Sequence, residues 1–383
     1  MPAHLYVHIP FCDGKCDYCG FYSVLAEPRL IALYPALPAA ELALELARVP
    51  ALAAEPVKTL YLGGGTPALL GADGLRALAA SLAARLPLDS LEEWTVELNP
   101  ASVTADLLRE MRALGVSRLS IGVQSLDDAV LARIGRRHSA ARARAAVRLA
   151  REAGFDDIGI DLIAGLPGVT PTQWRETLAQ AAALNLTHLS VYALSVESGT
   201  ALARRAAAGL RLPDDDAQLD ALDAAETALG EAGYVRYEIS NYALPGFECR
   251  HNLGVWHGRD YLGLGPAASS RYGRARWTNA PDLGGYIAEL AEGRPPPREE
   301  ETLGAEDDAC ERASFALRLR DGIDPLADAE RFPALRDRAE IWERRLERLA
   351  RHGIAERGGR RWRLTARGRE ICDAAVRELL APP

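Results

Sequence analysis

The first two hundred residues alternate short apolar, β-branched runs with longer alanine- and leucine-rich stretches of helical periodicity. Six of the short runs predict strands, and five of the longer stretches predict helices between them. Because strands that alternate with helices pair in parallel through right-handed crossovers, this order predicts an open or partial α/β barrel of six units. The predicted strands are 5–9, 59–62, 94–98, 119–123, 158–163 and 188–193, and the predicted helices are 39–48, 74–85, 105–114, 140–153 and 172–184.

Unusual residues follow five of these strands. In an α/β barrel, functional groups gather on the rim where the strands end, so residues after different strands come together in space. Here the features after successive strands are a cysteine-rich loop, the run Gly63-Gly-Gly-Thr-Pro67, the carboxylate of Glu97, the amide of Gln124, and the stretch from Asp161 to Gly168. Five such features on one rim predict a single site.

The cysteine-rich loop carries Cys12, Cys16 and Cys19 in a C-x3-C-x2-C spacing. Three thiolates on one loop suit an iron–sulfur cluster, and they leave one iron of a four-iron cube without a protein ligand. An open iron indicates that a substrate or cofactor binds there, and S-adenosylmethionine is the best-known occupant. A reduced cluster that gives one electron to this sulfonium cleaves a carbon–sulfur bond and releases a 5′-deoxyadenosyl radical, while the protein orients the cofactor and excludes water.

Two other readings of the cysteines fit less well. A zinc site needs four ligands, and His8, the nearby fourth candidate, lies on a predicted strand that would have to fold back onto the loop. A disulfide framework is also disfavoured, because six cysteines in 383 residues are sparse and three of them crowd together. The remaining three, Cys249, Cys310 and Cys372, are scattered and are typical of buried or incidental thiols.

The other rim residues supply complementary polarity. Successive glycines let a ligand approach the main chain, although a tight structural turn is the alternative. Carboxylates and an amide can bond ribose hydroxyls or an ammonium group, and a guanidinium fork matches a carboxylate, although each such residue alone is more often on a surface or in a salt bridge. The candidates are Gly64, Gly65, Thr66, Glu97, Gln124, Asp161 and Arg136, and Arg137 competes with Arg136 for the same role.

Composition narrows the class of protein. With 48% hydrophobic and 26% charged residues, the chain is typical of a soluble globular protein. No apolar run approaches the ~20 residues that span a bilayer, and we expect no membrane span. The sequence enters a predicted strand at once, without the regions of a secretory signal, and together with reduced thiols this predicts a cytoplasmic location.

Charge gives a weaker indication about nucleic acid. A net charge of −8 argues against a general nucleic-acid binder. Residues 331–370 are locally basic, with thirteen arginines against six acidic residues, so a nucleic-acid-binding modification enzyme stays a second alternative. The acidic residues Glu340, Glu343 and Glu347 alternate with these arginines as on a solvated helical face, and nucleic-acid binding is not favoured.

After Thr200 the repeat stops. Residues 214–232 predict an amphipathic helix, and the prolines and glutamates of 295–301 are typical of an exposed linker. Beyond them, two helical patterns, a strand-like turn and a last helix predict a winged-helix-like domain. We therefore divide the chain into a partial barrel at 1–235, a connecting segment at 236–298 and a C-terminal α+β domain at 299–383.

Four motifs together are specific to a known family. They are Tyr6-Val-His-Ile-Pro-Phe-Cys12, Gly63-Gly-Gly-Thr-Pro67, Arg118-Leu-Ser-Ile-Gly-Val-Gln-Ser125 and Asp161-Leu-Ile-Ala-Gly-Leu-Pro-Gly168. By these motifs the chain resembles the radical S-adenosylmethionine superfamily and, within it, the group of coproporphyrinogen dehydrogenases (HemN) and heme chaperones (HemW). The resemblance continues through Tyr261-Leu-Gly-Leu-Gly-Pro266 and covers nearly the whole chain.

The resemblance implies a role for each matching residue. Cys12, Cys16 and Cys19 would ligate a [4Fe–4S] cluster, and Tyr6 would pack beside it. Gly64, Gly65 and Thr66 would hold the methionine end of S-adenosylmethionine. The remaining cofactor contacts would come from Glu97, Gln124, Arg136 and Asp161. The family fold is a partial six-unit α/β barrel, as the strand pattern predicts independently.

Two departures favour the chaperone branch over the dehydrogenase. The dehydrogenases carry a further cysteine two positions after the triplet, where this chain has Phe21, and a long extension before the motif, where this chain has only five residues before Tyr6.

A third mark concerns heme. The run His251-Asn-Leu-Gly-Val-Trp256 resembles the HNxxYW signature of the chaperone branch, although Val255 stands where the signature has tyrosine. An imidazole is a competent axial ligand of heme iron, and a tryptophan can pack on a porphyrin face. His251 is therefore the candidate heme ligand.

The leading hypothesis is a heme chaperone that binds heme, a [4Fe–4S] cluster and S-adenosylmethionine and delivers heme to acceptor proteins, with an unidentified electron donor as a further partner. The enzyme alternative is oxidative decarboxylation of two propionates of coproporphyrinogen III to vinyl groups. No residue is assigned as catalytic, and the oligomeric state is not predicted.

Overall fold

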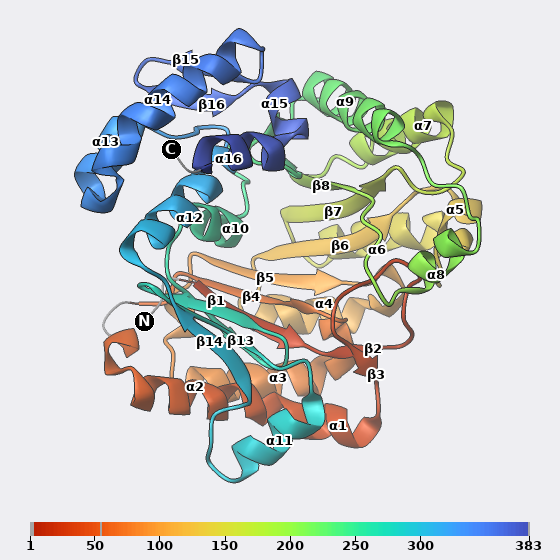
Figure 1. Ribbon diagram of the computed structural model, residues 1–383. Helices are drawn as coiled ribbons and strands as arrows, with labels where there is room; N and C mark the ends of the chain where they lie inside the picture. Colours follow the sequence, from red (N-terminus) through yellow and green to blue (C-terminus); the bar gives the residue numbers. More distant parts are fainter. Residues whose placement is uncertain (1–3, 54–55, 382–383) are drawn as a thin grey trace.

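A twelve-stranded sheet forms the centre of the computed structural model, which describes residues 4–53 and 56–381 (Figure 1). The six predicted strands are consecutive members of this sheet, and each pairs in parallel with the next. Their observed bounds are β1 His4–Ile9, β4 Thr59–Gly64, β5 Glu93–Leu98, β6 Arg118–Gln124, β7 Asp157–Ala164 and β8 His188–Ala193. The predicted parallel α/β core is thus confirmed.

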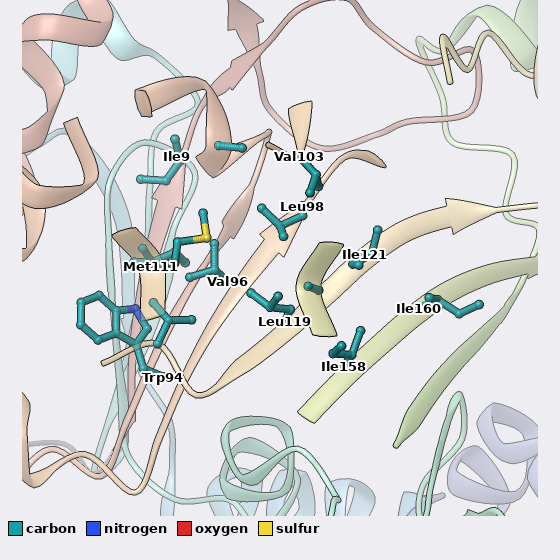
Figure 2. Packing of buried hydrophobic residues seen from close by; sticks show 14 of the residues in the cluster. Ile9, Trp94, Val96, Leu98, Val103, Met111, Leu119, Ile121, Ile158 and Ile160 are labelled. Carbon is teal, nitrogen blue, oxygen red and sulfur yellow. The ribbon is translucent and has the colours of Figure 1, made fainter. Parts of the chain in front are cut away.

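Alternation along these strands separates an apolar face from a polar one. Figure 2 shows the apolar face, where Val96, Leu119 and Ile160 of neighbouring strands point into a core that also contains Met111. The opposite face carries polar side chains such as Glu97 and Ser120. Because helices cover the apolar face, the polar face is left for the site.

Five helices lie where the sequence predicts them, within three residues at each end. They are α2 Leu37–Arg48, α3 Gly71–Ala83, α4 Ala105–Ala113, α6 Ala140–Glu152 and α7 Pro171–Ala182. Local signals fix their starts: the Thr170 side chain and Gln173 form a capping box at α7, and Ser139 caps α6. The remaining helices of this part are α1 Pro28–Leu33, α5 Asp128–Arg133, α8 Ala201–Ala207 and α9 Asp215–Glu231.

The sheet extends beyond the six predicted strands at both edges. β11 pairs in parallel with β1, and three further strands continue antiparallel from it. These added strands are β9 Val235–Arg236, β10 Asn241–Ala243, β11 Tyr261–Leu264, β12 Ser269–Tyr272, β13 Ala275–Asn279 and β14 Arg298–Thr302. The expected linker was wrong at its end, because the glutamates of β14 lie on an exposed edge strand and Glu301 pairs with Arg276.

One helical stretch, Pro28–Arg48, is long and apolar enough to cross a membrane by length and composition, with 21 residues and a mean hydropathy of 1.5. The expectation that no such run exists was therefore too strict. However, two acidic residues of α2 are buried against other parts of the chain: Glu41 accepts hydrogen bonds from Gly265 N and Tyr286 Oη, both at 2.7 Å, and Glu45 pairs with Arg298. These contacts are those of a helix in the core of a folded domain.

A second hydrophobic core lies toward the C-terminus, built around Trp342, Leu346 and Trp362. Its elements are α12 Ala305–Arg318, α13 Pro325–Arg331, α14 Arg336–Arg351, the hairpin of β15 Ala355–Gly358 and β16 Arg361–Leu364, α15 Ala366–Glu370 and α16 Cys372–Leu380. Helices followed by a hairpin and further helices give the expected winged-helix-like order. Where the chain divides into domains stays a prediction.

Two helices belong to the segment between the barrel and this second core. They are α10 Arg250–Trp256 and α11 Leu283–Ala291. Figure 1 shows α10 between the starts of the central strands and α12, whereas β2 (Phe11–Cys12) and β3 (Val24–Leu25) lie beyond the strand ends. The two ends of the barrel therefore carry different structures.

Candidate functional site

The three cysteines of the triplet lie on one loop that leaves the carboxyl end of β1. Val24 N donates to Pro10 O at 2.7 Å and Ala26 N to Cys12 O at 3.0 Å, so the return of the loop is paired with its start. Within the loop, Cys19 N donates to Cys16 O at 3.2 Å. The main chain thus holds the cysteines close to the strand ends.

The three thiols share this loop without forming a closed ligand set. Within residues 4–53 and 56–381, no three histidine, cysteine or acidic side chains converge on one metal position. Burial raises the pKa of the Cys19 thiol, so the thiolate form requires a metal cation beside it. Binding of a cluster therefore involves both rotation and deprotonation of these side chains.

Arg136 lies directly beside the cysteines. Its Nη1 donates to Cys16 Sγ at 3.4 Å and its Nη2 donates to Gly122 O, whereas its buried Nε has no hydrogen-bond partner among the described residues. Arg137, the competing candidate, points away with a largely exposed side chain and donates to Asp13 O at 2.5 Å. The buried, unpartnered donor of Arg136 faces the region where an anionic group would bind.

The glycine run is locked against the start of the cysteine loop. Gly65 N donates to Ile9 O at 2.8 Å and Thr66 N to Phe11 O at 2.7 Å. A Cβ at Gly65 would lie 2.5 Å from Phe11 O, and Gly64 has a φ of +101°, so neither position tolerates a side chain. Thr66 Oγ1 lies 3.9 Å from Cys12 Sγ and joins the two loops.

Glu97 reaches this glycine run from the end of β5. Its Oε2 accepts from Gly64 N at 3.1 Å, and its Oε1 accepts from Tyr61 Oη at 2.7 Å. Burial raises the pKa of Glu97 to about 7, the Asp161 carboxylate adds to the rise, and the Tyr61 hydroxyl opposes it. The carboxylate is thus poised to ionise when a cation approaches.

Asp161 and Gln124 complete the same rim. Ser120 Oγ donates to Asp161 Oδ1 at 3.2 Å, and burial raises the pKa of Asp161. Gln124 has a φ of +68° beside a register shift in β6, and its amide lies next to Gly122, the residue that Arg136 also contacts. The structure therefore brings the predicted polar residues of four strands to one rim.

Tyr6 and His8 form a pair on the inward face of β1. His8 Nε2 lies 2.9 Å from Tyr22 O and donates to that carbonyl, so Nδ1 accepts from Tyr6 Oη at 3.0 Å. Because both ring nitrogens are engaged, His8 does not supply the fourth ligand of a zinc site. The sequence reasoning missed this pairing and also Tyr61, although the two-residue period of strands places Tyr61 on the face of Gly63.

His251 lies at the opposite end of the barrel. It is on α10 and not in a loop, it is 6% exposed, and its Nδ1 shares the Thr59 hydroxyl with His4 Nδ1, at 2.9 Å from each. Thr59 precedes Gly64 by five residues on the same strand, which corresponds to about 16 Å. Burial, with His4 nearby, lowers the pKa of His251 to about 3. The structure thus separates His251 from the other predicted site residues.

The residues at the rim fit the groups that their types predict. Three thiols next to a guanidinium suit an anionic iron–sulfur cluster, and glycines without room for a Cβ suit a ligand bound through the main chain. The buried, unpartnered Nε of Arg136 is a ready donor for such a ligand. We find no corresponding arrangement around His251.

Comparison with known proteins agrees with this geometry. The profile of the Radical SAM superfamily matches residues 6–181. The heme chaperone HemW of Mycobacterium tuberculosis (strain H37Rv) is 39% identical and covers 99% of this chain and 95% of its own length. HemW of Escherichia coli K12 is 39% identical over 70% of both chains. The solved structure of coproporphyrinogen III oxidase (HemN) from Escherichia coli, a radical SAM enzyme, superposes with a TM-score of 0.85 at 26% identity and covers 99% of this chain and 90% of that one.

Fold, rim and profile define a radical SAM protein, and this superfamily implies a [4Fe–4S] cluster and S-adenosylmethionine. The likeness to the Mycobacterium tuberculosis protein extends over nearly the whole of both chains. The chain belongs to the HemW heme chaperone family.

Proposed function

We propose that this protein is a cytoplasmic heme chaperone that binds heme and delivers it to acceptor proteins. The observation that carries the proposal is the full-length likeness to a chain named as a heme chaperone, at 39% identity over 99% of this chain. Phe21, in the position where dehydrogenases have a further cysteine, supports the same choice and is 69% exposed.

In this proposal Cys12, Cys16 and Cys19 hold the cluster, whose open iron binds S-adenosylmethionine and supplies one-electron chemistry. Arg136 stabilises the cluster through Cys16 and offers its free Nε to an anionic group. The glycine run and Glu97 receive the methionine end of the cofactor. Thr66 contributes from the same run, and Tyr6 packs beside the cluster.

Gln124 and Asp161 would bond the ribose hydroxyls from the ends of β6 and β7. Ser120 orients Asp161 for this role because its hydroxyl occupies one carboxylate oxygen and leaves the other less engaged. An electron donor is a further partner that this chemistry requires. Acceptor proteins are the partners that heme delivery requires.

Parallel titration of the reconstituted protein tests the proposal. The cluster is assembled anaerobically, and the protein is then titrated with heme and, separately, incubated with coproporphyrinogen III, a reductant and S-adenosylmethionine. We expect saturable heme binding at one equivalent and no vinyl product. Formation of protoporphyrinogen at catalytic turnover would instead establish the dehydrogenase reaction, to which the HemN-like fold is related.

A further inference from the structure

A cavity of about 360 Å³ lies at the C-terminal end of α10, where the barrel meets the second core. Its apolar lining comes from α12 and the turn after α13, including Ala313, Phe332 and Leu335. A volume of this order lies within the range of small-molecule sites, which are mostly apolar with a few placed polar groups. None of its lining residues belongs to the rim of the cysteine loop.

Arginines line the mouth of this cavity. Arg312 and Arg331 lie over the ring of Phe332, at 5.7 and 5.1 Å from its centroid, and Arg361 donates to the carbonyls of Asp321 and Gly322. Neither Arg331 nor Arg361 forms an ion pair within the described part of the chain. Two cationic groups are therefore available to a carboxylate.

Acidic residues only partly balance this charge. Asp321 and Asp328 also line the cavity, and Arg312 is already paired with Asp308 outside the lining. Burial raises the pKa of Asp328, which weakens its negative charge near neutral pH. The cavity is thus apolar inside and cationic at its edge, a combination that suits a flat apolar molecule with carboxylates along one side.

His257 faces this cavity from the end of α10. Its ring is exposed and has no hydrogen-bond partner among the described residues. Burial and the nearby Arg259 lower its pKa, so the imidazole is neutral near pH 7 and can act as a metal ligand.

His251, the histidine of the motif, is in the opposite situation on the same helix. Six residues at about 100° each turn the two side chains about 120° apart, so they face different sides of α10. His251 contacts the rings of His4 and Tyr61, with centroids 5.8 and 5.1 Å away, and its Nδ1 is engaged with Thr59. Ligation of iron by His251 would require α10 to leave the barrel.

We propose that His257 is the axial ligand of heme iron and that Arg331 and Arg361 hold the heme propionates at the mouth of this cavity. The inference rests on the heme binding proposed above and names the site at which it occurs. The ligand class is a flat, apolar iron porphyrin with two carboxylates.

Titration with two porphyrins tests each part of this site. In the reconstituted full-length protein, His257→Ala raises the Kd for heme at least tenfold and removes the imidazole-ligated Soret spectrum. The Kd for iron-free protoporphyrin changes by less than twofold, because that ligand has no iron for the histidine to bind. Arg331→Ala raises the Kd for both porphyrins about fivefold, in line with the loss of one partly exposed charge-assisted hydrogen bond.

Matched surface variants serve as controls. His352→Ala and Arg336→Ala remove exposed residues of the second core that do not line the cavity, and both should bind heme as the unaltered protein does. Thermal melting and iron content verify that each variant is folded and loaded with its cluster.

The outcomes separate this inference from the proposed function. Heme binding that is unchanged by His257→Ala, or lost in a folded His251→Ala variant, would overturn the site while leaving heme carriage intact. An unaltered protein that binds no heme would overturn the proposed function itself.

Discussion

At the scale of single residues, Tyr61 joins the glycine run to the interior of the barrel. Its hydroxyl donates to Glu97 Oε1, and its ring contacts His251. Tyr61→Phe keeps the ring and removes the donor, so Glu97 loses a bond that orients its carboxylate. We expect the affinity for S-adenosylmethionine to fall about tenfold, as for the loss of a hydrogen bond to a charged group. Calorimetric titration of the anaerobic, cluster-loaded protein measures this, and Tyr272→Phe on β12 is the control that should bind normally.

The ionisation of Glu97 gives a pH dependence with a definite sign. Burial raises its pKa to about 7, so in the free protein the carboxylate is largely protonated at pH 5.5 and half ionised at pH 7. An ammonium group, with a pKa of about 7.7–8, stays charged over this interval. We expect the affinity for S-adenosylmethionine to increase from pH 5.5 to 7 and to become nearly flat in Glu97→Gln. An affinity that falls with rising pH would contradict the assignment of Glu97 to the ammonium group.

Rim residues could be predicted from the sequence because the ends of parallel strands meet at one edge, wherever the helices between them lie. The contacts among them could not, since Arg136 and Cys16 are 120 residues apart and only the closed sheet brings them together. His251 shows the reverse case. A motif predicted its type of chemistry, but its burial depends on Thr59 and His4, which no local pattern connects to it.

At the scale of elements, the six central strands could be predicted because each is an apolar run buried against helices. β11 to β14 escaped prediction because edge strands are held by their neighbours and carry no strong pattern of their own; β14 is mostly glutamate. α10 also escaped, because it is short and has a glycine in its middle.

Gly254 explains the sequence of α10 and provides a test. A Cβ at this position would lie 2.0 Å from His4 Nε2, so the helix approaches β1 too closely for any side chain. Gly254→Ala should therefore destabilise the protein by about 1–3 kcal/mol through overpacking, although alanine is the better helix former. Gly230→Ala in α9, where a Cβ meets nothing within 4 Å, should instead gain up to about 1 kcal/mol. Urea unfolding of both variants makes the comparison, and equal stabilisation by the two alanines would contradict the packing of α10 on β1.

At the scale of the whole molecule, the barrel and the second core are joined by buried polar contacts. Arg271 on β12 is 2% exposed and pairs with Asp308 and Glu311 of α12. Tyr237 O accepts from Arg320 N at 2.9 Å on another side of the junction. Such contacts are specific to the assembled structure, and composition could not have predicted them.

Arg271 therefore controls how firmly the second core is held. Arg271→Met removes the guanidinium and leaves Glu311 with Arg276 and Asp308 with Arg312 as their remaining partners, which we expect to cost about 3 kcal/mol. Arg276→Met, which removes a side chain that is 41% exposed, should cost less than about 1 kcal/mol. Hydrogen exchange followed by mass spectrometry locates the effect: in Arg271→Met the amides of α12 to α16 should exchange faster, while those of β5 to β7 keep their protection. Equal acceleration in both regions would show that the two cores unfold as one unit and that Arg271 does not hold a separable part of the molecule.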